Sequence, residues 1–270
     1  MDEHHFLPQF NRLSVVAAMI VLAYALLPII QSPARDLSFT LFGVLIAFRM
    51  DFALVISILA AGLAAAGTDW LIHDHPLLAK KPIYPHYLLP ALTAWVIGIP
   101  LGLLKVSLQW WAVFALGTLL LLGVLLAEYV SIDTKDTRHA LALMVLTAVS
   151  FGLFLTLTIS IRAAGLRLYL LLFTLVPVCA LLCLRLFHLR MQENWNFEWA
   201  GAITLVIAQI AMGLYYWPIA PIRYGLILMG IVYAMVEYAT QHQSVESIRT
   251  KLAGPLLVLG LFWVLALFIR

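Results

Sequence analysis

The stretch WWAVFALGTLLLLGVLLAEYV, residues Trp110–Val130, carries a single charged side chain, Glu128, near its end. A helix needs about 20 mostly apolar residues to cross a bilayer. Similar runs, bounded by charged or proline-containing segments, lie at Leu13–Ile30, Phe52–Ile72, Tyr87–Leu104, Ala140–Ile161, Leu168–Leu189, Trp199–Tyr216, Tyr224–Ala239 and Leu252–Ile269. Runs this continuous are not the alternating strands of a membrane barrel. The sequence therefore predicts an all-α, polytopic transmembrane helix bundle of eight or nine spans.

The composition excludes a water-soluble protein. Of 270 residues, 64% are hydrophobic and 11% are charged, whereas a soluble domain has roughly 25% charged residues. The net charge of +3 comes from scattered side chains, which argues against nucleic acid as a partner. Because every loop is short, we expect residues 1–270 to form a single transmembrane domain in the cell membrane, without a soluble domain. We also expect the first span to be retained as a signal anchor.

One apolar segment, Leu37–Phe48, is too short to be a span. Its 12 residues cannot cross the hydrocarbon core as a helix and are typical of a re-entrant or interfacial piece. Two interpretations follow: a slanted helix in the headgroup region, or a half-helix that dips into the membrane.

Polar residues are distributed unevenly between the two faces of the predicted bundle. We call face X the side of the N-terminus and of the loops after the second, fourth, sixth and eighth spans, and face Y the other side. Nine basic residues fall on face X and seven on face Y, a small bias that favours face X in the cytoplasm. All eight histidines and all acidic residues except Asp36 and Asp51 belong to face X. This face is either an ordinary solvated surface or a site that binds protons, metals or lipid headgroups.

The densest polar cluster on face X is the loop that holds Asp69 and the motif His73-Asp74-His75. Imidazole and carboxylate groups are usual ligands of divalent metals. A zinc site needs three or four ligands, so this loop would need help from His86, Glu128 or His139. The alternative is an ordinary turn that Pro76 ends, and we predict neither a metal nor a cofactor.

Glu128 and Glu237 each lie in the last turn of an apolar helix. A carboxylate there is costly if it faces hydrocarbon, and it opposes the negative end of the helix dipole. A cation such as Arg138 or Arg249 would offset both effects. The two residues are either acids at headgroup level or a pair that transfers protons.

A run of small residues, AAGLAAAG at Ala60–Gly67, precedes Asp69. Small residues let membrane helices pack closely, so this run predicts a packing face and a central position for its helix. Gly62, Ala66 and Asp69 fall on roughly one helical face. We therefore expect Asp69 to point into the same helix interface, where its partner would be Arg138, His139 or Arg185.

A weak internal repeat connects the two halves of the chain. Glu128-Tyr129 and Glu237-Tyr238 lie 109 residues apart at corresponding helix ends. Either the chain is a tandem repeat of 52–162 and 168–270, related as in some transporters, or leucine-rich helices share these positions by chance.

The centres of the predicted spans carry no Lys, Arg, Asp or Glu. This argues against an ion pump or a voltage sensor, both of which need charges along the pathway, and no common catalytic motif is present. The first hypothesis is a non-enzymatic membrane component: an accessory or scaffolding subunit, or a binder of lipid-like molecules, with membrane lipids and other membrane subunits as partners. The second is a transporter or membrane-embedded enzyme that acts on a lipid-linked substrate at face X. Its polar site would be drawn from Asp69, His73, Asp74, His75, His86, Glu128, His139 and Glu237.

Overall fold

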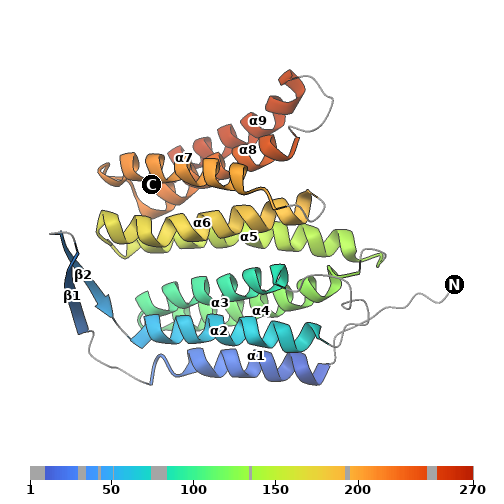
Figure 1. The fold of residues 1–270 in the computed structure, drawn as a ribbon. Helices are drawn as coiled ribbons and strands as arrows, with labels where there is room; N and C mark the ends of the chain where they lie inside the picture. Colours follow the sequence, from blue (N-terminus) through green and yellow to red (C-terminus); the bar gives the residue numbers. More distant parts are fainter. Residues whose placement is uncertain are drawn as a thin grey trace. The chain divides into compact units, whose positions relative to one another are not determined.

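Eight long apolar helices, a shorter helix and one β-hairpin make up the part of the chain that the computed structural model describes (Figure 1). That part comprises residues 10–29, 35–41, 44–50, 52–73, 84–133, 136–191, 195–241 and 248–269. The elements are α1 (Phe10–Ala25), β1 (Arg35–Leu41), β2 (Val44–Met50), α2 (Phe52–Ile72), α3 (Pro85–Leu103), α4 (Leu108–Val130), α5 (His139–Ala163), α6 (Leu168–Arg190), α7 (Phe197–Tyr215), α8 (Pro221–Gln241) and α9 (Ile248–Phe268). The predicted all-α membrane bundle is confirmed.

The span count follows from helix length. Helices α2 to α9 are each long and apolar enough to cross a membrane. Helix α1 has 16 residues, which at about 1.5 Å per residue gives roughly 24 Å, less than the hydrocarbon core of about 30 Å. Residues 26–29 continue it as tight turns, in which Leu27 N–H donates to the Tyr24 carbonyl. Among the described residues there are therefore eight helices of spanning length, the lower of the two predicted counts.

The described part of the segment Leu37–Phe48, residues 37–41 and 44–48, is not helical. It belongs to an antiparallel hairpin in which Leu37 pairs with Phe48 and Leu41 with Val44. The expectation of a slanted helix or a half-helix is therefore wrong. Residues 37–41 alternate between apolar and polar, and the β-branched or aromatic residues Phe39, Thr40 and Ile46 favour a strand.

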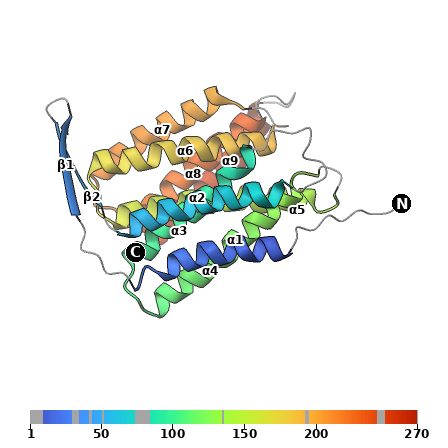
Figure 2. The ribbon, with the colours of Figure 1, turned by 60° about the horizontal axis from the view of Figure 1, so that its bottom comes forward.

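The chain divides into two compact units, residues 1–146 and 147–270, with the boundary inside α5. In the first unit α2 packs against both α1 and α3, α4 packs against α3, and α1 also contacts α4, as Figure 2 shows. Helix α2 thus packs between α1 and α3 in this unit, while its predicted central position in the whole bundle stays a prediction. The tandem repeat of 52–162 and 168–270 stays a prediction.

The packing face of α2 differs from the expected one. Ala60 and Ala64 are fully buried, and Gly67 faces α1 so closely that a Cβ atom there would overlap with the Val16 side chain. Gly62 and Ala66 lie on the exposed side of the helix, and no atom lies within 4 Å of the point where a Gly62 Cβ would be. The small-residue run is a packing face, but its buried stripe excludes the two positions chosen from the sequence.

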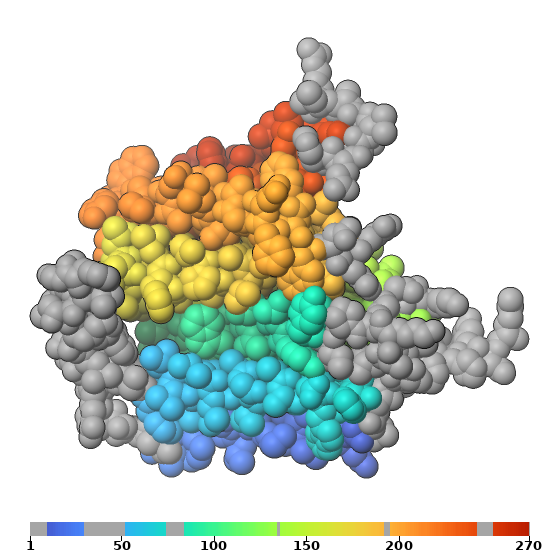
Figure 3. All heavy atoms as spheres, viewed as in Figure 1, coloured from blue at the N-terminus to red at the C-terminus, as the bar shows by residue number. Residues whose placement is uncertain are grey.

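The second unit is built from α6 to α9 and the C-terminal part of α5. Helix α6 packs against α7, as the space-filling view shows (Figure 3), and α8 packs against α9, α7 and α6. Close approach again depends on glycine. A Cβ atom at Gly225 of α8 would meet Ile159 of α5 at 2.7 Å, and one at Gly230 would meet Phe262 of α9 at 3.0 Å.

Candidate functional site

In the first unit, two of the candidate residues form a buried pair at face X. Pro85 opens α3, a position where its missing N–H costs nothing, and this places His86 in the first turn. Glu128 lies in the last turn of α4. His86 Nδ1 is 2.8 Å from Glu128 Oε2, and the side chains are 12% and 0% exposed. The structure thus brings together two residues that are 42 positions apart.

The partner of Glu128 explains how a carboxylate is accommodated at the negative end of a helix. The carboxylate reaches the first turn of α3, whose partial positive charge favours an anion. Ser131 Oγ donates to the Glu128 carbonyl at 2.8 Å and so caps the end of α4. The observed partner is an imidazole on the neighbouring helix, where the sequence suggested Arg138 or Arg249.

Asp69 lies near the end of α2, and its partner among the described residues is a tyrosine of α3 rather than a histidine or an arginine. The Tyr87 hydroxyl donates to Asp69 Oδ1 at 2.5 Å, which links the end of α2 to the start of α3. Asp69 is exposed. The expectation that it points into the interface with Gly62 and Ala66 and pairs with Arg138, His139 or Arg185 is therefore wrong. The stripe two positions away, Ala60, Ala64 and Gly67, is buried instead.

A basic side chain connects α1 to the same end of α2. Arg12 donates from a terminal guanidinium nitrogen to the Trp70 carbonyl at 3.0 Å, and its guanidinium carbon lies 5.1 Å from the centre of the Trp70 ring. Contacts of this kind attract a cation to the aromatic face. Arg12 therefore fastens the start of α1 to the end of α2.

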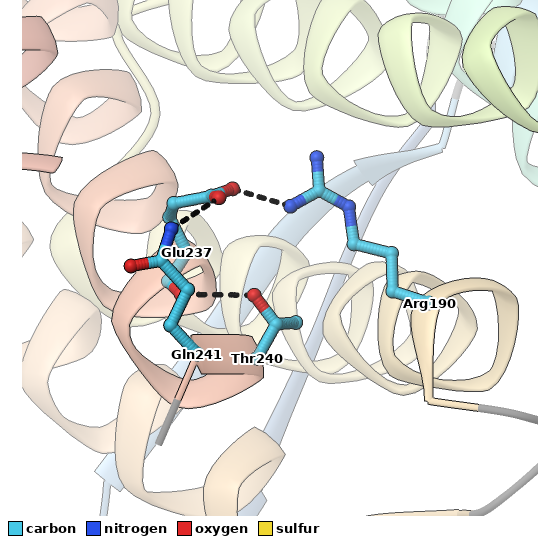
Figure 4. Close-up of polar contacts among 4 residues, drawn as sticks. All are labelled: Arg190, Glu237, Thr240 and Gln241. Carbon is cyan, nitrogen blue, oxygen red and sulfur yellow. Dashed lines mark hydrogen bonds and ion pairs between the residues drawn. The ribbon is translucent and has the colours of Figure 1, made fainter. Parts of the chain in front are cut away.

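In the second unit Glu237 forms its own ion pair at face X (Figure 4). Arg190, the last residue of α6, donates to Glu237 Oε2 at 2.5 Å, and Gln241 donates to Oε1 at 2.8 Å. Thr240 Oγ1 donates to the Glu237 carbonyl at 2.8 Å. The two charged side chains are 26% and 22% exposed. Glu237 therefore pairs with a cation that the sequence did not single out.

Two further groups on α6 lie close to this ion pair in sequence. Arg185 is 1% exposed and His188 is 8% exposed, and the His188 ring lies 4.9 Å from that of Trp195, just before α7. Sequence reasoning treated Arg185 only as a cation for Asp69 and missed Arg190 and Tyr87. The cluster of Arg185, His188 and Arg190 at the end of α6 was the signal that could have identified the two arginines.

The remaining candidates do not join either pair. His73 is exposed at the end of α2. His139 begins α5, and among the described residues its buried Nδ1 has no hydrogen-bond partner. Asp74 and His75 lie outside the described residues. Within the described ranges, no group of three or more His, Cys, Asp or Glu residues could hold a metal ion.

The first unit also holds a cavity, which is apolar and very small. Its volume is about 10 Å³, and it lies between α1, α3 and α4. The lining includes Ile20, Tyr24, Ile97, Leu101, Phe114 and Leu121. This is space for about one water molecule, whereas pockets for small ligands measure roughly 300–1,000 Å³. The cavity therefore reflects packing, and none of the candidate polar residues lines it.

Comparisons with curated proteins and with solved structures gave no match. One family does match: the family described as "Protein of unknown function (DUF5656)" covers residues 31–269. The match includes the hairpin, all eight helices of spanning length and both carboxylate pairs. The chain therefore belongs to the DUF5656 family.

Proposed function

We propose that the protein is a non-enzymatic component of the cell membrane that serves as an accessory or scaffolding subunit. Its partners are membrane lipids and other membrane subunits. The observation that carries the proposal is that three candidate carboxylates each join the ends of two helices. These are Asp69, Glu128 and Glu237.

An enzyme or transporter needs its polar groups to converge on a space that holds substrate. In the first unit, the Asp69–Tyr87 and His86–Glu128 contacts stabilise the α2–α3 and α3–α4 pairs. The cavity described between α1, α3 and α4 is apolar and of water size. In the second unit, Arg190–Glu237 joins α6 to α8. Contacts between helix ends give a stable scaffold whose outer surface remains available to neighbours in the membrane.

The test is purification of the full chain from its own membrane in a polymer that retains lipid. We expect one or more membrane subunits at constant stoichiometry, quantified against an unrelated polytopic protein purified in the same way. The double variant His86→Ala/Glu237→Gln should retain those subunits if it remains folded. A monodisperse single chain without a stoichiometric subunit would overturn the proposal.

A second candidate is an enzyme or transporter that acts on a lipid-linked substrate at face X, and one observation favours it. A buried carboxylate hydrogen-bonded to a partly exposed imidazole is an arrangement that general acid–base catalysis uses, and Glu128 with His86 provides it. Lipid analysis of cells that carry Glu128→Gln, with the exposed Glu198→Gln as control, separates the two candidates. Accumulation of a lipid-linked species only in Glu128→Gln supports the second candidate, and unchanged lipids support the first.

A further inference from the structure

Helix α7 buries one side and exposes the other. Its buried residues recur every three or four positions and are Ala200, Ile203, Thr204, Ile207 and Ala211. Within the second unit α7 packs against α6 and α8, and this stripe is the side that does so. Because successive residues of a helix turn by about 100°, Gln209 points away from Ile207. Gln209 is exposed on that outer side.

Gln209 lies at a depth where water does not reach its amide. It precedes Tyr215, the last residue of α7, by six residues, which places it about 9 Å from that helix end. The exposed Tyr216 and Trp217 follow directly, and aromatic residues at a helix end are typical of the headgroup level. A glutamine side chain is shorter than the distance to that level, so the amide stays among the acyl chains.

The amide of Gln209 needs a partner that the described chain does not supply. It carries one carbonyl acceptor and two N–H donors, and within the described residues it makes no hydrogen bond. An amide without a hydrogen bond is costly in an apolar medium. In membranes, glutamine side chains form hydrogen bonds across helix interfaces. Gln209 therefore indicates that another helix lies against the outer side of α7.

The exposed residues around Gln209 recur with the spacing of a two-helix seam. They are Ala202, Leu205, Gln209, Met212 and Tyr216. Their steps of three and four positions give the seven-residue repeat by which two helices pair in a left-handed supercoil. Gly201 and Gly213 flank this seam, and no atom lies within 4 Å of the point where either would carry a Cβ. The seam therefore has room for a neighbouring backbone.

The seam ends at headgroup level on the side of face X. The preceding position of the repeat is Glu198, in the first turn of α7, where the positive end of the helix dipole favours a carboxylate. Glu198 precedes Gln209 by three helical turns, so its charge stays outside the apolar part of the seam.

We infer that α7 is a dimerisation helix, which pairs with α7 of a second copy of this chain and joins the two Gln209 amides across a two-fold axis. The choice of a second copy follows from the amide. A two-fold interface presents the same residue from both sides, and glutamine is complementary to itself, because each amide donates to the carbonyl of the other. The inference is independent of the accessory-subunit proposal, which concerns other chains.

The first test measures dimerisation of the full chain in phosphatidylcholine vesicles by single-molecule photobleaching. One dye is attached at the exposed Arg138→Cys, in a parent chain where Cys179 and Cys183 are replaced by alanine. We expect two bleaching steps for the parent chain. Gln209→Leu should weaken dimerisation about tenfold, because it removes the hydrogen bonds between the helices. Gln209→Asn keeps an amide and should retain more of the dimer, and Leu257→Ala, at an exposed position of α9, should not change it.

The second test keeps Gln209 intact and therefore does not depend on the folding of its variants. Single cysteines replace Leu205 and Met212 on the seam, or the exposed Phe173 on α6 and Leu257 on α9 as controls. Mild oxidation in the membrane should link two copies through residue 205 or 212 and not through residue 173 or 257. The reason is that a disulfide needs Cα atoms within about 7 Å of each other.

Four results would overturn the inference. A single bleaching step for the parent chain at every protein-to-lipid ratio would show that acyl chains alone cover the outer side of α7. Equal dimerisation of the parent chain and Gln209→Leu would show that the amide does not join the copies. Disulfides from residue 205 or 212 to a chain of different mass would assign the seam to another subunit. Equally efficient links through residues 173 and 257 would show that the copies meet by random collision.

Discussion

At the scale of single residues, the buried pair His86–Glu128 joins the start of α3 to the end of α4. Removing one partner of a buried ion pair is strongly destabilising, and Glu128 is fully buried. We expect His86→Ala to lower the melting temperature of the detergent-solubilised protein. The exposed His73→Ala should leave it unchanged.

A double-mutant cycle isolates the pair itself. The variants His86→Ala, Glu128→Ala and the double variant should show a coupling of about 0.5–3 kcal/mol, as contacting residues do. A coupling of zero would mean that the 2.8 Å contact does not stabilise the fold.

Gly67 offers a second prediction at this scale, with a control on the same helix. A Cβ atom at Gly67 would overlap with the Val16 side chain, whereas the space at Gly62 is open. Overpacking costs about 1–3 kcal/mol. Gly67→Ala should therefore lower the free energy of unfolding, Gly62→Ala should have little effect, and Val16→Ala should partly rescue Gly67→Ala. Equal thermal stability of the two glycine variants would contradict the observed packing of α1 on α2.

At the scale of elements, Arg162 at the end of α5 holds the end of α7 in place. Its guanidinium donates to the carbonyls of Tyr215 at 3.0 Å and Trp217 at 2.8 Å, and it lies 5.4 Å from the centre of the Tyr224 ring. A cation at the C-terminus of a helix is favourable because it opposes the partial negative charge there. One side chain thus joins α5, α7 and α8.

Loss of this side chain should loosen the α7–α8 turn without unfolding the unit. A hydrogen bond to a charged group contributes about 1.5–3 kcal/mol, so Arg162→Ala should speed amide hydrogen exchange of residues 216–220 by roughly tenfold or more. Arg162→Lys should give an intermediate rate, because an ammonium group lacks the fork that reaches two carbonyls. The exposed Arg167→Ala is the control. Unchanged exchange in Arg162→Ala would show that the turn is held by its own backbone.

Long apolar runs in the sequence are sufficient to predict the bounds of the spanning helices. The predicted run Phe52–Ile72 coincides with α2, and Leu168–Leu189 differs from α6 by one residue. Long apolar runs are reliable because the bilayer sets their length. The segment Leu37–Phe48 was misjudged because a 12-residue apolar run fits a helix or a hairpin, and the pairing of strands decides between them.

At the scale of the whole molecule, the order of spanning helices makes a prediction about sidedness. Four helices, α4 to α7, separate Lys105 from Trp217, and two, α3 and α4, separate His73 from Arg138. If each crosses the membrane once, cysteines at residues 105 and 217 must lie on face Y, and cysteines at residues 73 and 138 on face X.

The measurement is labelling by a membrane-impermeant maleimide in sealed vesicles of each orientation, with Cys179 and Cys183 replaced. We expect residues 105 and 217 to react in one orientation and residues 73 and 138 in the other. Reaction of residues 105 and 217 in different orientations would mean that one of the helices α4 to α7 does not span. The same experiment identifies the cytoplasmic face, for which the distribution of basic residues favours face X.

The sequence by itself determined that this is an all-α membrane protein, where its long helices lie, and that its carboxylates gather at helix ends near face X. These properties are local, because they follow from the hydrophobicity of continuous runs and from the cost of charge in hydrocarbon. Only the tertiary structure decided that Glu128 pairs with His86, Asp69 with Tyr87 and Glu237 with Arg190. Such partners depend on which helices pack and on how each is rotated about its axis. The buried stripe of α2 lies two positions from the one chosen from the sequence, so Gly62 is exposed and Gly67 is buried.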